Sequence, residues 1–268
     1  MNTRLRTTTE VVTTAADRLR AAELTRMPCD PVRDLIGSAD LDAAYAVQQR
    51  NIDARIDAGA TVVGRKIGLT SEAVQRQLGV HQPDLGVLLD DMQCAGDEPI
   101  AITRLLQPKI EAEIAFVLAE DLTDGPFDVS RIRAAIAYAV AALEIVDSRI
   151  ANWDITFGDT VADNGSSGLF VLGDERRTLD DFDPVAAQMR MRIDGGAVSE
   201  GNGAACLGDP LNAVAWLAKT AHEFGSPLRA GHVILSGALG PMAPVAAGNT
   251  VTAEVTGLGS VTATFIQE

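Results

Sequence analysis

The segment 109–118 constrains the fold more than any other stretch of the chain, because its residues alternate in the manner of a β-strand. One face of this strand carries the apolar residues Ile110, Ala112, Ile114 and Phe116. The other face carries Glu111 and Glu113, whose side chains project in the same direction roughly 7 Å apart. The chain must therefore build a sheet around this segment, and that sheet has to accommodate two like charges.

The residue pattern changes near residue 60 from helical to extended. In the first sixty residues, apolar side chains recur at helical spacing. We expect Thr9 to cap a helix over 10–26, and Asp40 to cap a second helix that ends at Gly59. The sequence therefore predicts an N-terminal helical region, residues 1–60, packed on a core formed by residues 61–268.

Short strands separated by glycines, with a few helices between them, are expected in the rest of the chain. The helices are predicted at 71–78, 130–142 and 211–224, the last opened by Asp209 and Pro210. Further strands are predicted at 61–68, 142–146, 232–235, 250–255 and 260–266. This mixture indicates the α+β class rather than a doubly wound sheet. No GxGxxG follows a strand and no GxxxxGK[ST] occurs, which excludes the common nucleotide-binding folds.

The chain is acidic, with 37 Asp and Glu residues against 22 Lys and Arg residues and a formal net charge of −15. Nucleic acids and anionic lipids both attract basic surfaces, so neither is expected as a partner. The longest apolar run, 134–143, is far shorter than the about 20 residues that span a bilayer. The N-terminus lacks a signal-peptide pattern, and three cysteines without CxxC spacing predict no disulfide framework. We therefore expect a cytoplasmic protein.

A third carboxylate changes the interpretation of the two on the strand. The two alone could lie on a solvated face, with Lys109 reducing their repulsion. Glu144, however, is the lone charge inside the apolar segment 140–146, and a buried carboxylate must be neutral, paired or bound to metal. Pairing with Arg149 is one alternative. The other is an oxygen-ligated Mg²⁺ or Mn²⁺, since the three histidines are widely spread.

Two further charged residues lie beside glycines. Lys66 ends a predicted strand between Gly64 and Gly68, where it could clamp a charge or move a proton. Asp84 follows Pro83 in a turn. An ordinary surface lysine and an ordinary turn residue are the alternatives for these two positions. The residues by themselves indicate a carboxylate-ligated metal enzyme and no more.

Seven blocks of this chain resemble the 2-keto-4-pentenoate hydratases (2-hydroxypenta-2,4-dienoate hydratases), which belong to the fumarylacetoacetate hydrolase superfamily. The blocks are GRKIGLT (64–70), QPDLG (82–86), QPKIEAEIA (107–115), ALEIVDSRI (142–150), DTVADN (159–164), CLGDPLN (206–212) and SGALGPM (236–242). They occur in order, and the similarity runs from about residue 33 to residue 265. Seven ordered blocks are far more specific than any one of them.

The resemblance implies a mixed β-sandwich or β-roll core with added helices, so that 61–268 would be the catalytic domain. It implies these site residues: metal ligands Glu111, Glu113 and Glu144, acid/base residues Lys66 and Asp84, and substrate contacts Ser167, Leu85 and Arg65. It further implies Mg²⁺ or Mn²⁺ as cofactor and a homo-oligomer, a pentamer or decamer. The implied reaction is that of a hydro-lyase, the addition of water to 2-hydroxypenta-2,4-dienoate to give 4-hydroxy-2-oxopentanoate in aromatic or steroid ring catabolism.

Three alternatives stay open. A 4-oxalocrotonate decarboxylase would use the same scaffold on a substrate with a second carboxylate, which Arg65, Arg149 or Arg190 could contact. A hydratase for a longer dienoate would need a roomier or more basic pocket. The chain could also be a silent subunit that activates a partner, although burying three carboxylates without a function is costly. Association with a downstream aldolase or a paired decarboxylase is a further expectation.

Overall fold

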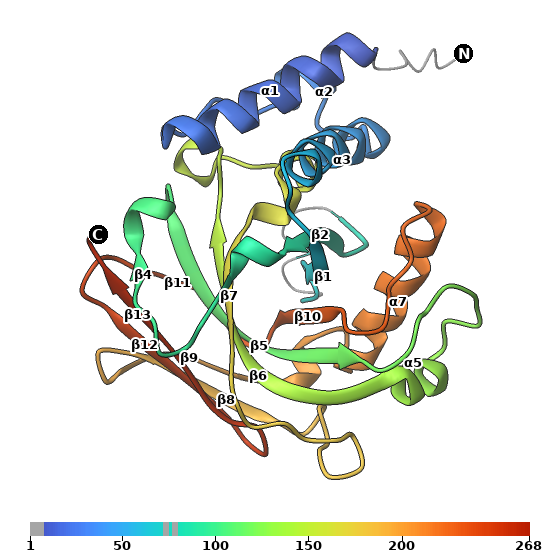
Figure 1. Cartoon of the computed structure of the whole chain (residues 1–268), viewed down its shortest axis with the longest axis vertical. Helices are drawn as coiled ribbons and strands as arrows, with labels where there is room; N and C mark the ends of the chain where they lie inside the picture. The colour runs from blue at the N-terminus through green and yellow to red at the C-terminus, as the bar shows by residue number, and fades with distance from the viewer. Residues whose placement is uncertain (1–7, 72–74, 77–79) are drawn as a thin grey trace.

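The computed structural model describes residues 8–71, 75–76 and 80–268, which form two β-sheets and a set of helices above and beside them (Figure 1). The helices are α1 (Thr9–Thr25), α2 (Arg33–Ile36), α3 (Leu41–Asp57), α5 (Val129–Ala135), α6 (Phe157–Ala162) and α7 (Pro210–Glu223). The strands are β1 (Val62–Gly68), β2 (Asp84–Leu89), β3 (Gln93–Cys94), β4 (Ile100–Ala101), β5 (Pro108–Leu118), β6 (Ile136–Asp147), β7 (Ser167–Leu172), β8 (Gln188–Ile193), β9 (Gly196–Asn202), β10 (Val233–Ala238), β11 (Ala243–Pro244), β12 (Thr250–Val255) and β13 (Gly259–Ile266). This mixture confirms the predicted α+β class.

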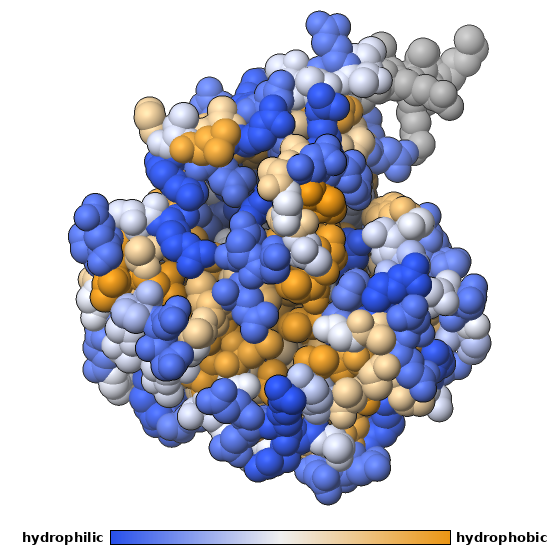
Figure 2. Space-filling model, viewed as in Figure 1, coloured by the Kyte–Doolittle hydropathy of each residue, from blue (hydrophilic) through white to orange (hydrophobic). Residues whose placement is uncertain are grey.

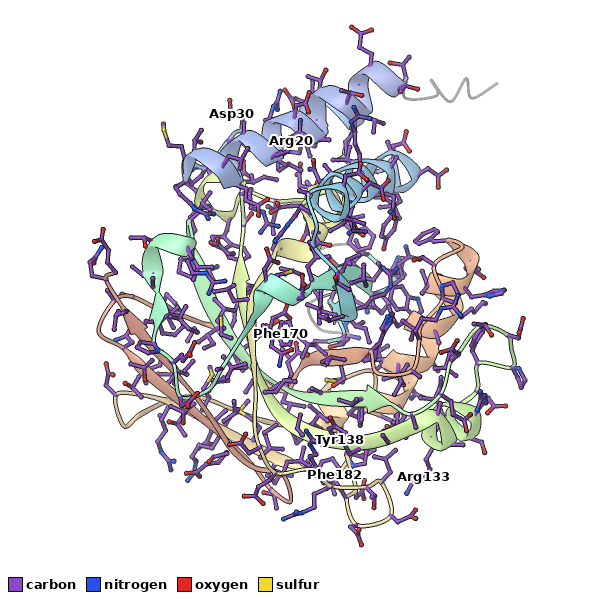
Figure 3. All side chains as sticks on the ribbon, in the orientation of Figure 1. Arg20, Asp30, Arg133, Tyr138, Phe170 and Phe182 are labelled. Carbon is purple, nitrogen blue, oxygen red and sulfur yellow. The ribbon has the colours of Figure 1, made fainter. Side chains whose placement is uncertain are left out.

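The larger sheet holds β5, the strand predicted at 109–118. Its order is β2-β1-β10-β5-β6-β7-β3, and β11 also pairs with β5. Strands β5 and β6 are its longest antiparallel pair, and both bend strongly, so the sheet curls around its own inner face (Figure 1). Figure 3 shows Phe170 of β7 in the middle of the molecule, and this fully buried ring belongs to the apolar core on that inner face.

The outer face of the larger sheet packs against the second sheet, of order β4-β13-β12-β8-β9, and against α5 and α7. The alternation of β5 divides the two faces as predicted. Ile110, Ile114 and Phe116 point into the core between the sheets, whereas Ala115 and Val117 face the inner core. Glu111 and Glu113 share the parity of Ala115 and therefore belong to the inner face.

The N-terminal helices form a separate apolar cluster with α6, centred on residues such as Ala15, Ala44 and Val161. In Figure 1 they lie over one end of the curled sheet. The Asp40 side chain accepts from the Ala43 amide and caps α3, as predicted. Helix α1 is capped by Thr8 rather than by the predicted Thr9, a difference of one residue.

One predicted boundary was wrong. The alanine-rich segment 130–142 was expected to be helical, but α5 ends at Ala135 and β6 already begins at Ile136. Both faces of β6 are covered by apolar cores, so it lacks the polar–apolar alternation that identifies a half-exposed strand. Its backbone pairs with β5 along most of its length and with β7 over residues 142–146, and this pairing outweighs the helix propensity of alanine.

The remaining predicted elements agree with the structure, including α7 with Asp209 as its cap and the strands near the C-terminus. Most of the helix predicted at 71–78 lies outside the described residues. Among the residues that the structure describes, no helix is both long enough and apolar enough to span a membrane.

Candidate metal centre

Three carboxylates meet on the inner face of the larger sheet. Glu111 of β5 lies directly opposite Glu144 of β6, and Glu113 follows two residues along β5. Each side chain offers one oxygen atom, and these atoms lie within 4.8 Å of one another. Glu113 and Glu144 are buried, with exposed fractions of 0% and 1%, whereas Glu111 is partly exposed. A solvated strand face, the alternative considered for the first two, is therefore ruled out.

The grouping is electrostatically costly without a cation. Burial, and next the charge of Glu144, raise the pKa of Glu111 to about 8. The same two causes raise the pKa of Glu113 well above its usual value. Within the described part of the chain, Oε1 of Glu113 and both oxygens of Glu144 accept no hydrogen bond. Buried anionic oxygens in this state need a positive partner.

Lys66 supplies one positive charge from another strand. Its Nζ lies 3.3 Å from Oε1 of Glu144, and its side chain is only 4% exposed. Burial by itself would lower the pKa of Lys66, but the nearby carboxylates, Glu144 foremost, outweigh burial and raise it. The surface-lysine alternative is thus wrong. One ammonium cannot balance the charges of Glu111, Glu113 and Glu144 when all three are ionised.

Arg149, the partner considered for Glu144, pairs elsewhere. Its Nε lies 2.5 Å from Oδ1 of Asp163, and Nη1 donates to the carbonyls of Asp147 and Ser167. Burial raises the pKa of Asp163 to about 6, although the Arg149 charge acts against that rise. This buried pair joins the end of β6 to the turn before β7.

Asp84 is the first residue of β2 and pairs with Gly68 of β1, rather than lying in an exposed turn. It is 2% exposed, and its Oδ1 has no hydrogen-bond partner within the described residues. Burial raises the pKa of Asp84, and the Lys66 charge offsets that only in part. A Cβ at Gly68 would collide with this carboxyl group, so the glycine makes the room that Asp84 occupies.

Two further glycines, Gly165 and Gly86, leave space for the side chains of Lys66 and Ser167. A Cβ at Gly165 would lie 2.6 Å from Cε of Lys66, and a Cβ at Gly86 would lie 2.7 Å from Oγ of Ser167. Ser167 therefore faces the same side of the sheet as Lys66, and its hydroxyl donates to the Asn164 carbonyl at 2.9 Å. The structure brings Lys66, Asp84 and Ser167 to the inner face beside the carboxylates.

Leu85 and Arg65 lie differently, because adjacent residues of a strand project to opposite faces. Leu85 is buried in the apolar core on the outer face of the larger sheet. Arg65 donates from Nη2 to Ser226 Oγ at 2.8 Å, next to the end of α7. The predicted roles of both in substrate binding stay predictions, since their side chains leave the face that carries the carboxylates.

The donor set fits a hard divalent cation. Three carboxylates, two of them fully buried, provide oxygen ligands, and unpartnered oxygens remain among them.

One functional group of the site was not predicted from the sequence. It is the Gly237 N–H, which donates to Oε2 of Glu113 at 2.7 Å and so orients this carboxylate. The block SGALGPM contains this glycine, but a backbone donor has no side-chain signature in a sequence.

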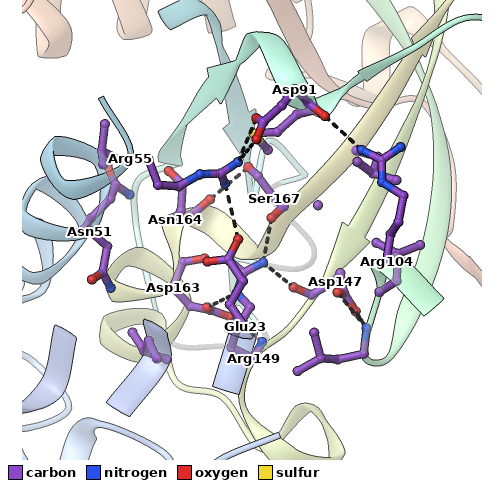
Figure 4. A pocket seen from close by; sticks show the side chains of 18 of the residues that line it. Glu23, Asn51, Arg55, Asp91, Arg104, Asp147, Arg149, Asp163, Asn164 and Ser167 are labelled. Atoms are coloured by element: carbon purple, nitrogen blue, oxygen red, sulfur yellow. Dashed lines mark hydrogen bonds and ion pairs between the residues drawn. The ribbon is translucent and has the colours of Figure 1, made fainter. Parts of the chain in front are cut away.

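A separate polar pocket of about 250 Å³ lies between the N-terminal helices and the start of β7 (Figure 4). Its charged side chains neutralise one another: Arg55 contacts Asp91 at 2.6 Å and Glu23 at 3.4 Å. Arg104 donates to the Asp91 carbonyl at 2.9 Å. The pocket includes Ser167 but none of the three glutamates.

Known proteins resemble this chain in sequence and in fold. The family model described as fumarylacetoacetate (FAA) hydrolase C-terminal matches residues 63–266. A 2-keto-4-pentenoate hydratase of Burkholderia vietnamiensis is 54% identical, covering 96% of this chain and 98% of its own. A Pseudomonas putida protein named TodF product hydratase is 55% identical, covering 96% of each chain. The solved structure of 4-oxalocrotonate decarboxylase from Pseudomonas putida G7, complexed with magnesium and adipate, superposes with a TM-score of 0.91 at 36% identity, covering 97% of this chain and 98% of that chain. The chain therefore belongs to the fumarylacetoacetate hydrolase family.

Proposed function

We propose that this protein is a metal-dependent hydro-lyase that adds water to 2-hydroxypenta-2,4-dienoate and forms 4-hydroxy-2-oxopentanoate. The observation that carries the proposal is the buried cluster of Glu111, Glu113 and Glu144 with Lys66 beside it. Relatives named 2-keto-4-pentenoate hydratase, 50–54% identical over nearly the whole chain, support the choice of substrate.

The three glutamates would hold Mg²⁺ or Mn²⁺. Mg²⁺ is bound in the related decarboxylase structure, and oxygen ligands suit either ion. The chemistry that a divalent cation supplies at such a site is stabilisation of negative charge on the substrate's carboxylate and 2-oxygen.

Lys66 acts as a charge partner in this proposal. The carboxylates around it, Glu144 foremost, raise its pKa and favour the protonated ammonium, whose Nζ lies 3.3 Å from Oε1 of Glu144. It would donate hydrogen bonds from Nζ to the substrate oxygens that carry negative charge. Its buried position excludes water from that contact, which strengthens the interaction.

Asp84 is suited to the two proton transfers. In the first step the 2-hydroxyl loses its proton and C5 gains one, which leaves a C3–C4 alkene next to the ketone. In the second step the oxygen of water bonds to C4, and C3 gains a proton. A carboxyl group whose pKa is raised by burial can hold a proton for C5 and later accept one from water.

The decarboxylase alternative requires a cation for the second carboxylate of its substrate. The three arginines considered for that role are engaged elsewhere: Arg65 contacts Ser226, Arg149 pairs with Asp163, and Arg190 pairs with Glu200 on the second sheet. The sequence identity to the decarboxylase is 36%, against 54% for the hydratase, and this difference also favours a hydratase over a decarboxylase.

The test offers the purified protein three substrates with Mg²⁺: 2-hydroxypenta-2,4-dienoate, its six-carbon homologue 2-hydroxyhexa-2,4-dienoate, and 2-oxohex-3-enedioate. Loss of dienol absorbance, product NMR and CO₂ release are followed separately. We expect hydration of the five-carbon substrate without CO₂. Release of CO₂ from the dicarboxylate, with no hydration of either dienoate, would replace the proposal with a decarboxylase.

The metal requirement is tested in the same assay. EDTA should abolish hydration, and added Mg²⁺ or Mn²⁺ should restore it. Glu113→Gln is the matched variant, because the amide keeps the shape of the side chain but removes a charged ligand. Full activity of metal-stripped protein would contradict the proposed role of the glutamates.

We further propose a homo-oligomer, a pentamer or decamer, in a reducing compartment such as the cytoplasm. Leu24 in the last turn of α1 and Met27 just after this helix support the homo-oligomer, because both apolar side chains are at least 70% exposed. The free thiols of Cys29, Cys94 and Cys206 support a reducing compartment.

The division into a helical region, 1–60, and a catalytic domain, 61–268, is supported by a family match that begins at residue 63. Association with an aldolase or a paired decarboxylase stays a prediction.

A further inference from the structure

Strand β10 departs from regular pairing directly beside the metal centre. Leu235 lies opposite Ala115, but the next registered pair joins Ala238 to Glu113. Three steps along β10 therefore match two along β5, which is a β-bulge. Gly237 lies in this bulge with φ of +110°, a region that favours glycine.

The bulge turns a backbone donor toward a glutamate. The Gly237 N–H donates to Oε2 of Glu113 at 2.7 Å, whereas Oε1 accepts nothing among the residues described. Glu113 is fully buried, so bulk solvent does not hydrate its carboxylate. One oxygen is thereby held by the backbone, and the other stays without a hydrogen-bond partner among the described residues and is available to a metal.

Gly237 is itself held from two sides. A Cβ at this position would collide with the Thr70 side chain, so the peptide lies closely against that residue. On the carbonyl side, the thiol of Cys206 donates to the Gly237 oxygen at 3.0 Å. Burial raises the pKa of the Cys206 thiol to about 12, so the sulfur keeps the proton it donates.

We propose that Gly237 and Cys206 are positioning residues for Glu113: the thiol fixes the peptide of the bulge, and the amide of that peptide fixes which carboxylate oxygen is presented to the metal. This inference rests on the proposed metal site and not on the identity of the substrate. Groups that orient a ligand in this way commonly alter metal affinity by about 10–100-fold when removed.

Cys206 is the better position for a test, because Gly237→Ala adds both a collision and an unfavourable φ and could fail to fold. Cys206→Ala removes the donor and one sulfur atom. Cys206→Ser keeps an O–H donor at the same place. Cys94→Ala is the matched control, since Cys94 is also buried but its sulfur accepts from Arg104, far along the sheet at β3.

The measurement is Mg²⁺ binding to the metal-stripped full chain, by calorimetry, with Mn²⁺ binding followed by electron paramagnetic resonance as a second readout. Melting in EDTA shows that each variant is folded. We expect Cys206→Ala to weaken binding by about tenfold or more, Cys206→Ser to recover most of the affinity, and Cys94→Ala to match wild type.

Three results would overturn the inference: wild-type affinity in Cys206→Ala, equal losses in Cys206→Ala and Cys94→Ala, or no binding of either ion to wild type. Gly237→Ala, compared with Gly231→Ala, adds a further test where it folds. Gly231 also has positive φ but no neighbour within 4 Å of a built Cβ, so it reports strain alone. Metal binding without hydration would refute the proposed function but leave this inference standing.

Discussion

Lys66→Met removes the cation nearest to the buried carboxylates while keeping most of the volume of the lysine stem. In the metal-free protein, Glu144 would lose its partner at 3.3 Å, and Asp84 and Glu113 would lose a nearby opposing charge. Removing one member of a buried ion pair costs about 3–5 kcal/mol. For a chain of this size, each kcal/mol shifts Tm by roughly 2–4 °C, so Tm in EDTA should fall by about 6–20 °C.

Two conditions should reduce the fall in Tm of Lys66→Met, because both restore the charge balance of the site. Saturating Mg²⁺ adds two positive charges, and the variant no longer places an ammonium beside the ion. Lower pH protonates carboxyl groups whose pKa is already raised, so the loss at pH 6 should be smaller than at pH 8.

The assay is differential scanning fluorimetry of wild type and variant at both pH values, in EDTA and in Mg²⁺. Lys219→Met is the matched control, since Lys219 is exposed and forms an ion pair with Glu223 at 4.0 Å, a pair of small energetic value. A Tm within 2 °C of wild type in EDTA, or a loss that neither Mg²⁺ nor pH changes, would refute the charge-balance argument.

Three further predictions follow from the same geometry. Asp84→Asn should lower kcat/KM by about 10²–10⁴ with little change in KM, and deuterium uptake at C5 will show whether the first proton transfer is lost with the second. In EDTA, the free energy of unfolding should fall as pH rises between about 4.5 and 8, because folded Glu111 retains a proton that the unfolded chain releases. Urea denaturation should show a slope of up to about 1.4 kcal/mol per pH unit, flattened in Glu111→Gln. Arg149→Met should cost about 3–5 kcal/mol in the same denaturation assay by leaving Asp163 unpaired, and a cost below 1 kcal/mol would contradict the role assigned to that pair.

Features with a local cause could be predicted from the sequence. The alternation at 109–118 assigns Glu111 and Glu113 to one face because neighbouring side chains of a strand must project oppositely. The caps at Asp40 and Asp209 depend on side chains that bond to amides two or three residues away. Family resemblance added candidate roles that periodicity alone could not supply.

Other features were decided by tertiary structure. In the alanine-rich segment 130–142, residues 130–135 are helical as expected, but residues 136–142 form a strand because β5 pairs along them. Arg149, close to Glu144 in the chain, pairs with Asp163 instead.

The metal centre itself depends on contacts between distant segments. Glu144 lies opposite Glu111 only through the register of β5 with β6, and Lys66 reaches Glu144 only because the sheet curls. Local patterns predict which face of a helix or strand carries a side chain, because they depend only on the period of that one element. They do not predict which residue lies opposite that side chain on the neighbouring strand, because strand order, register and curvature arise from packing of the whole sheet.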